Sequence, residues 1–126
     1  MLTTLTTKLI LTILLTNFVG DQIIQPKKIL EAKDDNILII IMHVVIWSLP
    51  ILIFCWYYIA IFQEWDILLW WMWCFAFHIC IDYLTGAIIK SSIKNKEYYK
   101  AVIYIHGQQF LVITFMLITF YYRIMQ

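Results

Sequence analysis

Residues 37–62 read ILIIIMHVVIWSLPILIFCWYYIAIF, and this stretch decides the fold class. Only His43, Ser48 and Pro50 interrupt its apolar run. A helix that crosses the hydrocarbon core of a bilayer needs about 20 predominantly apolar residues. We therefore expect a transmembrane helix here, and an all-α membrane protein built around it.

The composition of the whole chain agrees with this expectation. Of the 126 residues, 63% are hydrophobic and only 13% are charged, whereas soluble domains have about 45–50% apolar and about 25% charged residues. This length fits a single domain covering residues 1–126. The net charge of +1 argues against a nucleic acid as partner, because phosphate binding needs clustered basic surface. The expected partner is the lipid bilayer.

Three further stretches complete a predicted bundle of four transmembrane helices. Residues 67–89 and 101–122 are apolar with few embedded polar groups, whereas residues 2–20 are richer in threonine and contain Lys8. Threonine is tolerated in such a helix because its hydroxyl can bond to a carbonyl one turn earlier. We expect this first helix to be retained rather than cleaved as a signal peptide, because residues 16–19 offer no small-residue cleavage site.

The connections predict the orientation in the membrane. Residues 25–36 predict a short surface helix, residues 63–66 a tight turn, and residues 90–100 a polar connection. The positive-inside rule places the lysine-rich connections in the cytoplasm and both termini outside. The lysines of the first and third connections are Lys27, Lys28, Lys33, Lys90, Lys94, Lys96 and Lys100.

Polar side chains fall at similar depths in several predicted helices. At 1.5 Å per residue, His43, Asp82 and His106 lie roughly 10 Å from the cytoplasmic ends of their spans, with His78 one turn deeper. His78 and Asp82 are four residues apart and share one helix face. An isolated charge in hydrocarbon costs several kcal/mol, so we expect one shared polar pocket in the cytoplasmic half of the bundle. Asp21, Gln25 and Gln109 belong to the same predicted layer.

Four segments of the chain resemble a known family of membrane proteins. The segments are NFVGDQIIQPKKILEAK (residues 17–33), MHVVIW (42–47), HICIDYLTG (78–86) and GQQFLVI (107–113). They resemble the domain of unknown function 3307 family, which comprises small membrane proteins of bacteria and their phages. The resemblance implies a shared site and no particular activity. Its motif positions correspond here to Asp21, Gln25, Lys33, His43, His78 and Asp82.

The chain departs from this family pattern at two places. Asn17 stands where a histidine often precedes the first aspartate. The late Asp-Gln-x-x-His motif reads Gln108, Gln109 and Val112, so its acid and its histidine are both replaced. His106, six residues before Val112, is an alternative histidine for the site.

The predicted polar layer suits a divalent metal ion. Imidazole and carboxylate are ligands for zinc, manganese or iron. His78 and Asp82 can reach one ion, with Asp21, His43 or His106 completing the set. An open coordination position would activate water to hydrolyse a lipid-derived or phosphoester substrate. The residues expected to orient the ligands or anchor the substrate are Gln25, Lys33, Gln108 and Gln109.

Two other interpretations stay open at this point. The polar layer can be purely architectural in a structural subunit of a membrane or phage assembly, or in a homo-oligomer, because polar contacts between membrane helices contribute about 0.6 kcal/mol each. Intramembrane ionisable residues also mark ion or proton paths. The outer half of the bundle offers only Ser48, Thr114 and Thr119 for such a path.

Overall fold

The computed structural model describes residues 2–20 and 36–124, and its elements there are all helices. They are α1 (Leu2–Phe18), α3 (Ile37–Phe62), α4 (Asp66–Lys94) and α5 (Tyr98–Ile124). The expected all-α fold is therefore confirmed for these residues. The surface helix predicted within residues 25–36 falls almost entirely outside the described residues, and it stays a prediction.

Three of the four helices are long and apolar enough to cross a membrane, namely α3, α4 and α5. Helix α1 is apolar but has only 17 residues, which is shorter than the about 20 residues that a span needs. The chain is thus a multi-pass membrane protein with three candidate spans. The fourth predicted span, residues 2–20, is an apolar helix of marginal length.

Side-chain and backbone caps fix both ends of α3. The side chain of Asn36 accepts a hydrogen bond from the backbone N–H of Leu38 at 2.9 Å, which satisfies one of the free donors of the first turn. At the other end Gln63 adopts a left-handed conformation with φ 56°, and its N–H donates to the carbonyl of Ile59 at 2.8 Å. Such a residue stops a helix, so the tight turn predicted at residues 63–66 is confirmed, with Asp66 already in α4.

Most of the polar segment 90–100 is helical, whereas the sequence predicts a connection there. Helix α4 continues to Lys94 and α5 begins at Tyr98, which leaves only residues 95–97 between them. The N–H of Glu97 donates to the carbonyl of Ser92 at 2.8 Å, closing this turn. With 29 residues, α4 is about 43 Å long, whereas the hydrocarbon core is about 30 Å thick. The helices end beyond the apolar run because a helix can continue into the headgroup region.

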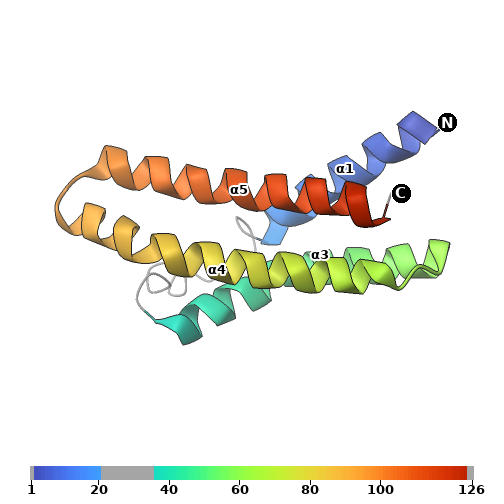
Figure 1. The fold of residues 1–126 in the computed structure, drawn as a ribbon, viewed down its shortest axis with the longest axis horizontal. Coiled ribbons are helices and arrows are strands. Elements are labelled where there is room, and N and C mark those ends of the chain that lie inside the picture. Colours follow the sequence, from blue (N-terminus) through green and yellow to red (C-terminus); the bar gives the residue numbers. More distant parts are fainter. Residues whose placement is uncertain (1, 21–35, 125–126) are drawn as a thin grey trace.

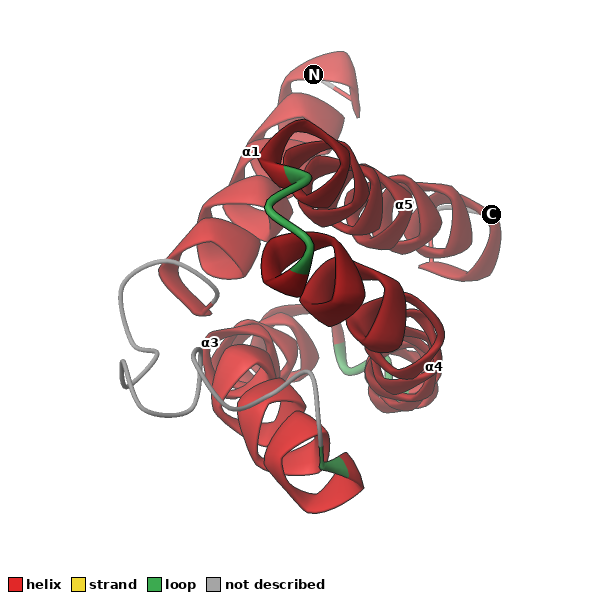
Figure 2. Cartoon of the chain, turned by 90° about the vertical axis from the view of Figure 1, so that its left-hand side faces the viewer, coloured by secondary structure: helices red, strands yellow, loops and turns green. Residues whose placement is uncertain are grey.

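The four helices form a ring of neighbours. Helix α1 contacts α3 and α5, and α4 contacts α3 and α5, as the end-on view in Figure 2 shows. In Figure 1 the first turn of α1, the last turn of α5 and the α3–α4 turn lie at one end of the bundle, and residues 95–97 lie at the other. This alternation agrees with the predicted placement of termini and connections. Which end faces the cytoplasm stays a prediction.

The buried residues of α4 change from apolar to polar along the bundle. On α4 the buried residues recur every three or four positions, from Ile67, Trp70 and Cys74 to His78 and Asp82, as expected for one helix face. The apolar part of the core therefore lies toward the α3–α4 turn, and the polar part lies toward residues 95–97. The largest fully buried side chains of the hydrophobic core are Ile13, Trp47, Ile51, Ile67, Trp70 and Met116.

A glycine lets the end of α1 approach α3 closely. A Cβ atom added to Gly20 would overlap the backbone carbonyl of Trp47. Trp47 lies one helical turn after His43, so this contact places the end of α1 beside the polar part of the core. Gly20 is required here for the close approach of two backbones.

We predict that Gly20→Ala lowers the free energy of unfolding by about 1–3 kcal/mol, because the overlap with a backbone atom forces the two helices apart. Thermal unfolding of the detergent-purified protein measures this loss. The matched control is Gly107→Ala, since a Cβ at Gly107 meets nothing within 4 Å. The control should be neutral or stabilise the protein by up to about 1 kcal/mol. Equal unfolding temperatures for the two variants would contradict the proposed close contact.

Candidate metal centre

Two helices bring three ionisable side chains together in the polar part of the core. His43 comes from α3, and His78 and Asp82 come from α4. The i,i+4 spacing of His78 and Asp82 places both on one helix face, and packing of α3 against α4 brings His43 to them. All three are buried, with exposed fractions of 0% for His43 and 3% for the other two.

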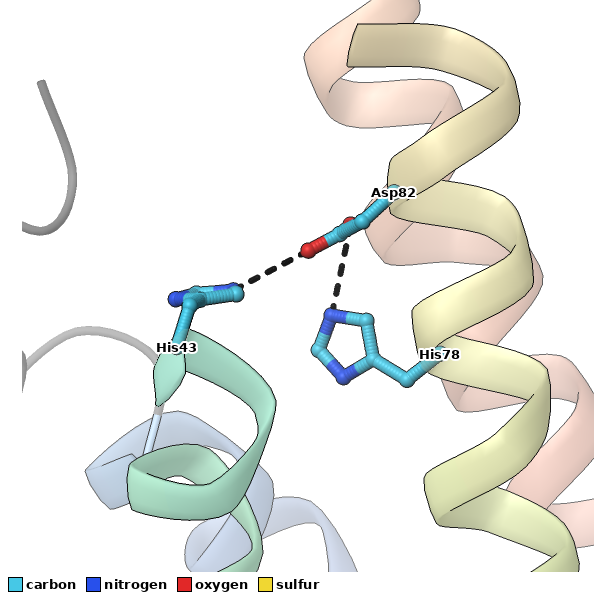
Figure 3. A group of neighbouring side chains, drawn as sticks. All are labelled: His43, His78 and Asp82. Carbon is cyan, nitrogen blue, oxygen red and sulfur yellow. Dashed lines mark ion pairs between the residues drawn. The ribbon is translucent and has the colours of Figure 1, made fainter. Parts of the chain in front are cut away.

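The carboxylate of Asp82 lies between the two imidazole rings, with one oxygen facing each ring (Figure 3). The His43 Nε2–Asp82 Oδ2 distance is 3.3 Å, and the His78 Nε2–Asp82 Oδ1 distance is 3.5 Å. The two rings meet edge to face, with their centroids 5.4 Å apart. The three side chains thus converge on one small volume between α3 and α4.

These distances are longer than those of tight ion pairs and are compatible with shared metal ligands. Charge-assisted N–O hydrogen bonds are usually about 2.7–2.9 Å long. In a tetrahedral zinc site with bonds of about 2.0–2.2 Å, neighbouring ligand atoms are about 3.3–3.6 Å apart. Each of the three residues offers a ligand atom, and these atoms lie within 4.8 Å of one another. The three residues are therefore close enough to hold one ion, with each imidazole nearest to a different oxygen of Asp82.

Trp47 connects this group to α1. Its ring packs edge-on against His78, with centroids 4.2 Å apart, and it fixes one side of that imidazole. The indole Nε1–H donates to Asn17 Oδ1 at 2.9 Å, and Asn17 is itself buried. The buried indole and amide thereby satisfy each other across the α1–α3 interface.

Helix α5 contributes a buried amide at a neighbouring level. Gln108 Nε2 donates to the hydroxyl of Thr85, and this hydroxyl donates to the carbonyl of Ile81 at 2.7 Å. Thr85 follows Asp82 by three residues on α4. Each of the four described helices therefore places a buried polar side chain in or next to one layer. His43, His78 and Asp82 were expected in this layer, whereas on α5 the buried residue is Gln108 rather than His106 or Gln109.

The structure does not bring His106 to this group. His106 is exposed and lies two residues before the inward-facing Gln108, about 200° away around the helix. Its expected place in the layer came from depth alone, counted from residue 101, and α5 begins earlier, at Tyr98. Gln109 is only partly buried, so on α5 the inward position belongs to Gln108.

Three further predicted site residues, Asp21, Gln25 and Lys33, lie outside the described residues and stay predictions. Sequence reasoning gave no role to Trp47 or Thr85. For Trp47 the available signal was its position four residues after His43, on the same helix face. Val112, where the resembled family has a histidine, is buried on the inward face of α5.

Comparison of the chain with protein-family models, with curated proteins and with solved structures finds no match. The resemblance to the domain of unknown function 3307 family therefore stays a prediction.

We predict that Asn17→Leu lowers the free energy of unfolding by about 1–3 kcal/mol, because it leaves the buried Trp47 indole without an acceptor. Replacing Trp47 by Phe in the same chain should recover part of this loss, since the unsatisfied donor is then gone. Chemical denaturation of the two single variants and the double variant measures the coupling energy. Strictly additive losses would show that the Asn17–Trp47 bond does not couple α1 to α3.

Proposed function

We propose that this protein is a membrane-embedded divalent-metal protein in which His43, His78 and Asp82 bind one ion. The observation that carries the proposal is the spacing of a buried His-His-Asp group, with His–Asp separations of 3.3 and 3.5 Å. Each of the three residues offers one ligand atom, and these atoms lie within 4.8 Å of one another, which is close enough for them to share one ion.

Among the three expected metals we infer zinc. Two imidazoles and one carboxylate are ligands of six-coordinate non-haem iron sites, whereas zinc accepts the low coordination number that this small group offers. Two imidazoles and one carboxylate also form a common ligand set of zinc enzymes.

Three protein ligands would leave one coordination position of the ion open for a reaction. Catalytic zinc sites keep three protein ligands and one open position, which water or substrate takes. When bound, such an ion polarises a coordinated oxygen and activates water for hydrolysis. The ring of Trp47 packs against His78, with centroids 4.2 Å apart, and limits movement of that imidazole. In the cytoplasmic half of the bilayer, the substrates within reach are lipid headgroup linkages and phosphoesters, so we infer one of these as the substrate class.

A purely architectural role is the second candidate, favoured by the contacts around the group. Asn17 bonds to Trp47 across α1 and α3, and Gln108 bonds to Thr85 across α4 and α5. Polar contacts of this kind hold membrane helices together at about 0.6 kcal/mol each. In this case the His-His-Asp group stabilises the α3–α4 interface in a structural subunit of a membrane complex.

Metal analysis of the detergent-purified protein separates the two candidates. We predict about one equivalent of zinc in the wild type, and loss of the metal in His78→Ala and in Asp82→Ala, because each variant removes a ligand. The matched control is His106→Ala, which removes an exposed histidine from the same membrane segment and should keep the metal. Metal-free wild-type protein, still metal-free after zinc is added and excess is removed, would favour the architectural role.

A variant of Asp21 tests whether this residue supports the site. Asp21 directly follows Gly20, which packs against Trp47. We predict that Asp21→Asn weakens zinc binding roughly tenfold, as expected for a carboxylate that orients a metal ligand and leaves the fourth coordination position open. Competition with a chromogenic chelator measures the affinity, and unchanged affinity would show that Asp21 has no part in the site.

A further inference from the structure

A polar hollow of about 350 Å³ lies at the opposite end of the bundle from the α3–α4 turn. The last turns of α4 and the start of α5 form it, around the connection at residues 95–97. Its polar lining consists of Ser91, Ser92, Asn95, Glu97 and Lys100. Hydroxyl, amide and ammonium donors therefore outnumber the single carboxylate in this hollow.

Ser92 is the lining residue that most clearly points to a ligand. It continues the inward stripe of α4 and is 98% buried, with an exposed fraction of 2%. Ser48, Thr85 and Thr119 each donate their hydroxyl to a carbonyl three or four residues earlier. Within the described part of the chain, the Ser92 hydroxyl makes no such bond. A buried hydroxyl that lines the hollow is thus available to a bound group.

The electrostatics of this end favour an anion. Residues 90–100 contain four lysines and one glutamate, a net charge of +3. Lys100 Nζ lies 3.5 Å from Glu97 Oε2, and both side chains are about half exposed. The first backbone N–H groups of α5 have no partner within the helix, and they add a positive partial charge beside the hollow.

The position of the hollow along the bundle identifies the source of this anion. Because α4 and α5 are longer than the hydrocarbon core, their connected ends reach the depth of the lipid headgroups. Ala87 and Ile88 line the hollow on the side nearer the membrane interior. A ligand with a phosphate at one end and an acyl chain at the other matches both linings.

We propose that this hollow binds the headgroup phosphate of an anionic phospholipid. Ser92 and Asn95 donate hydrogen bonds to the phosphate oxygens, and Lys100 supplies the cationic partner. Binding draws Lys100 away from Glu97, so the carboxylate of Glu97 opposes the phosphate. This site is separate from the His-His-Asp group and does not depend on metal binding there.

The test measures retention of phosphatidylglycerol, compared with phosphatidylcholine, by native mass spectrometry of the detergent-purified protein. Ser92→Ala should weaken phosphatidylglycerol binding roughly tenfold, since it removes a hydrogen bond to a charged group without changing the net charge. Lys100→Gln should weaken it by at least as much. Glu97→Gln should strengthen it, because a competing carboxylate is removed.

Two controls separate a built site from diffuse attraction. Lys94→Gln changes the net charge as Lys100→Gln does, at a lysine outside the lining, and it should weaken binding by no more than about fivefold. Ser48→Ala removes a hydroxyl in α3 and should leave binding unchanged. Equal losses in Lys94→Gln and Lys100→Gln, together with wild-type binding in Ser92→Ala, would overturn the proposal.

Inorganic phosphate serves as the second probe in the same experiment. Displacement of the lipid by phosphate, with the same dependence on Ser92, would show that the phosphate group alone is recognised. Retention of the lipid in excess phosphate, with the Ser92 dependence intact, would assign the ligand to the intact phospholipid. Binding of phosphatidylcholine as tight as that of phosphatidylglycerol would count against recognition of an anionic headgroup.

Discussion

The carboxylate of Asp82 is the group on which the arrangement of the bundle depends. An unpaired charge in the interior of a membrane protein costs several kcal/mol, so this side chain must meet partners inside the protein. It lies between His43 and His78, at 3.3 and 3.5 Å. Because these imidazoles come from different helices, the requirement fixes which faces of α3 and α4 meet and at what height.

The rest of the bundle supports this group from both sides. Toward the α3–α4 turn, apolar side chains such as Ile51, Ile67 and Trp70 fill the core, and their van der Waals packing holds the helices together. Around the group itself, Trp47 donates a hydrogen bond to Asn17 and Thr85 accepts one from Gln108, so these bonds satisfy neighbouring polar side chains. Toward residues 95–97 the inward stripe becomes polar again at Ser92. The proposed metal centre and the proposed phosphate site are thus two levels of one amphipathic bundle, one inside the bilayer and one at its surface.

Much of the fold was predictable because its signals are local. The apolar run at residues 37–62 predicted α3 with the bounds that the structure shows, and the i,i+4 spacing of His78 and Asp82 predicted their shared face. Other expectations failed for physical reasons. The polar composition of residues 90–100 predicts a connection, yet most of these residues continue the helices. His106 was placed by depth alone, but rotation around α5 directs it away from the core.

The sequence by itself determined the class of protein, the helices and the polar residues that hydrocarbon cannot solvate, because hydrophobicity and helical periodicity act over a few neighbouring residues. Only the tertiary structure decided which of those polar residues meet. Contacts between distant residues set that choice, such as Gly20 against the Trp47 backbone and Gln108 on Thr85. The rotation and sliding of one helix against another depend on such packing, and no single helix contains that information.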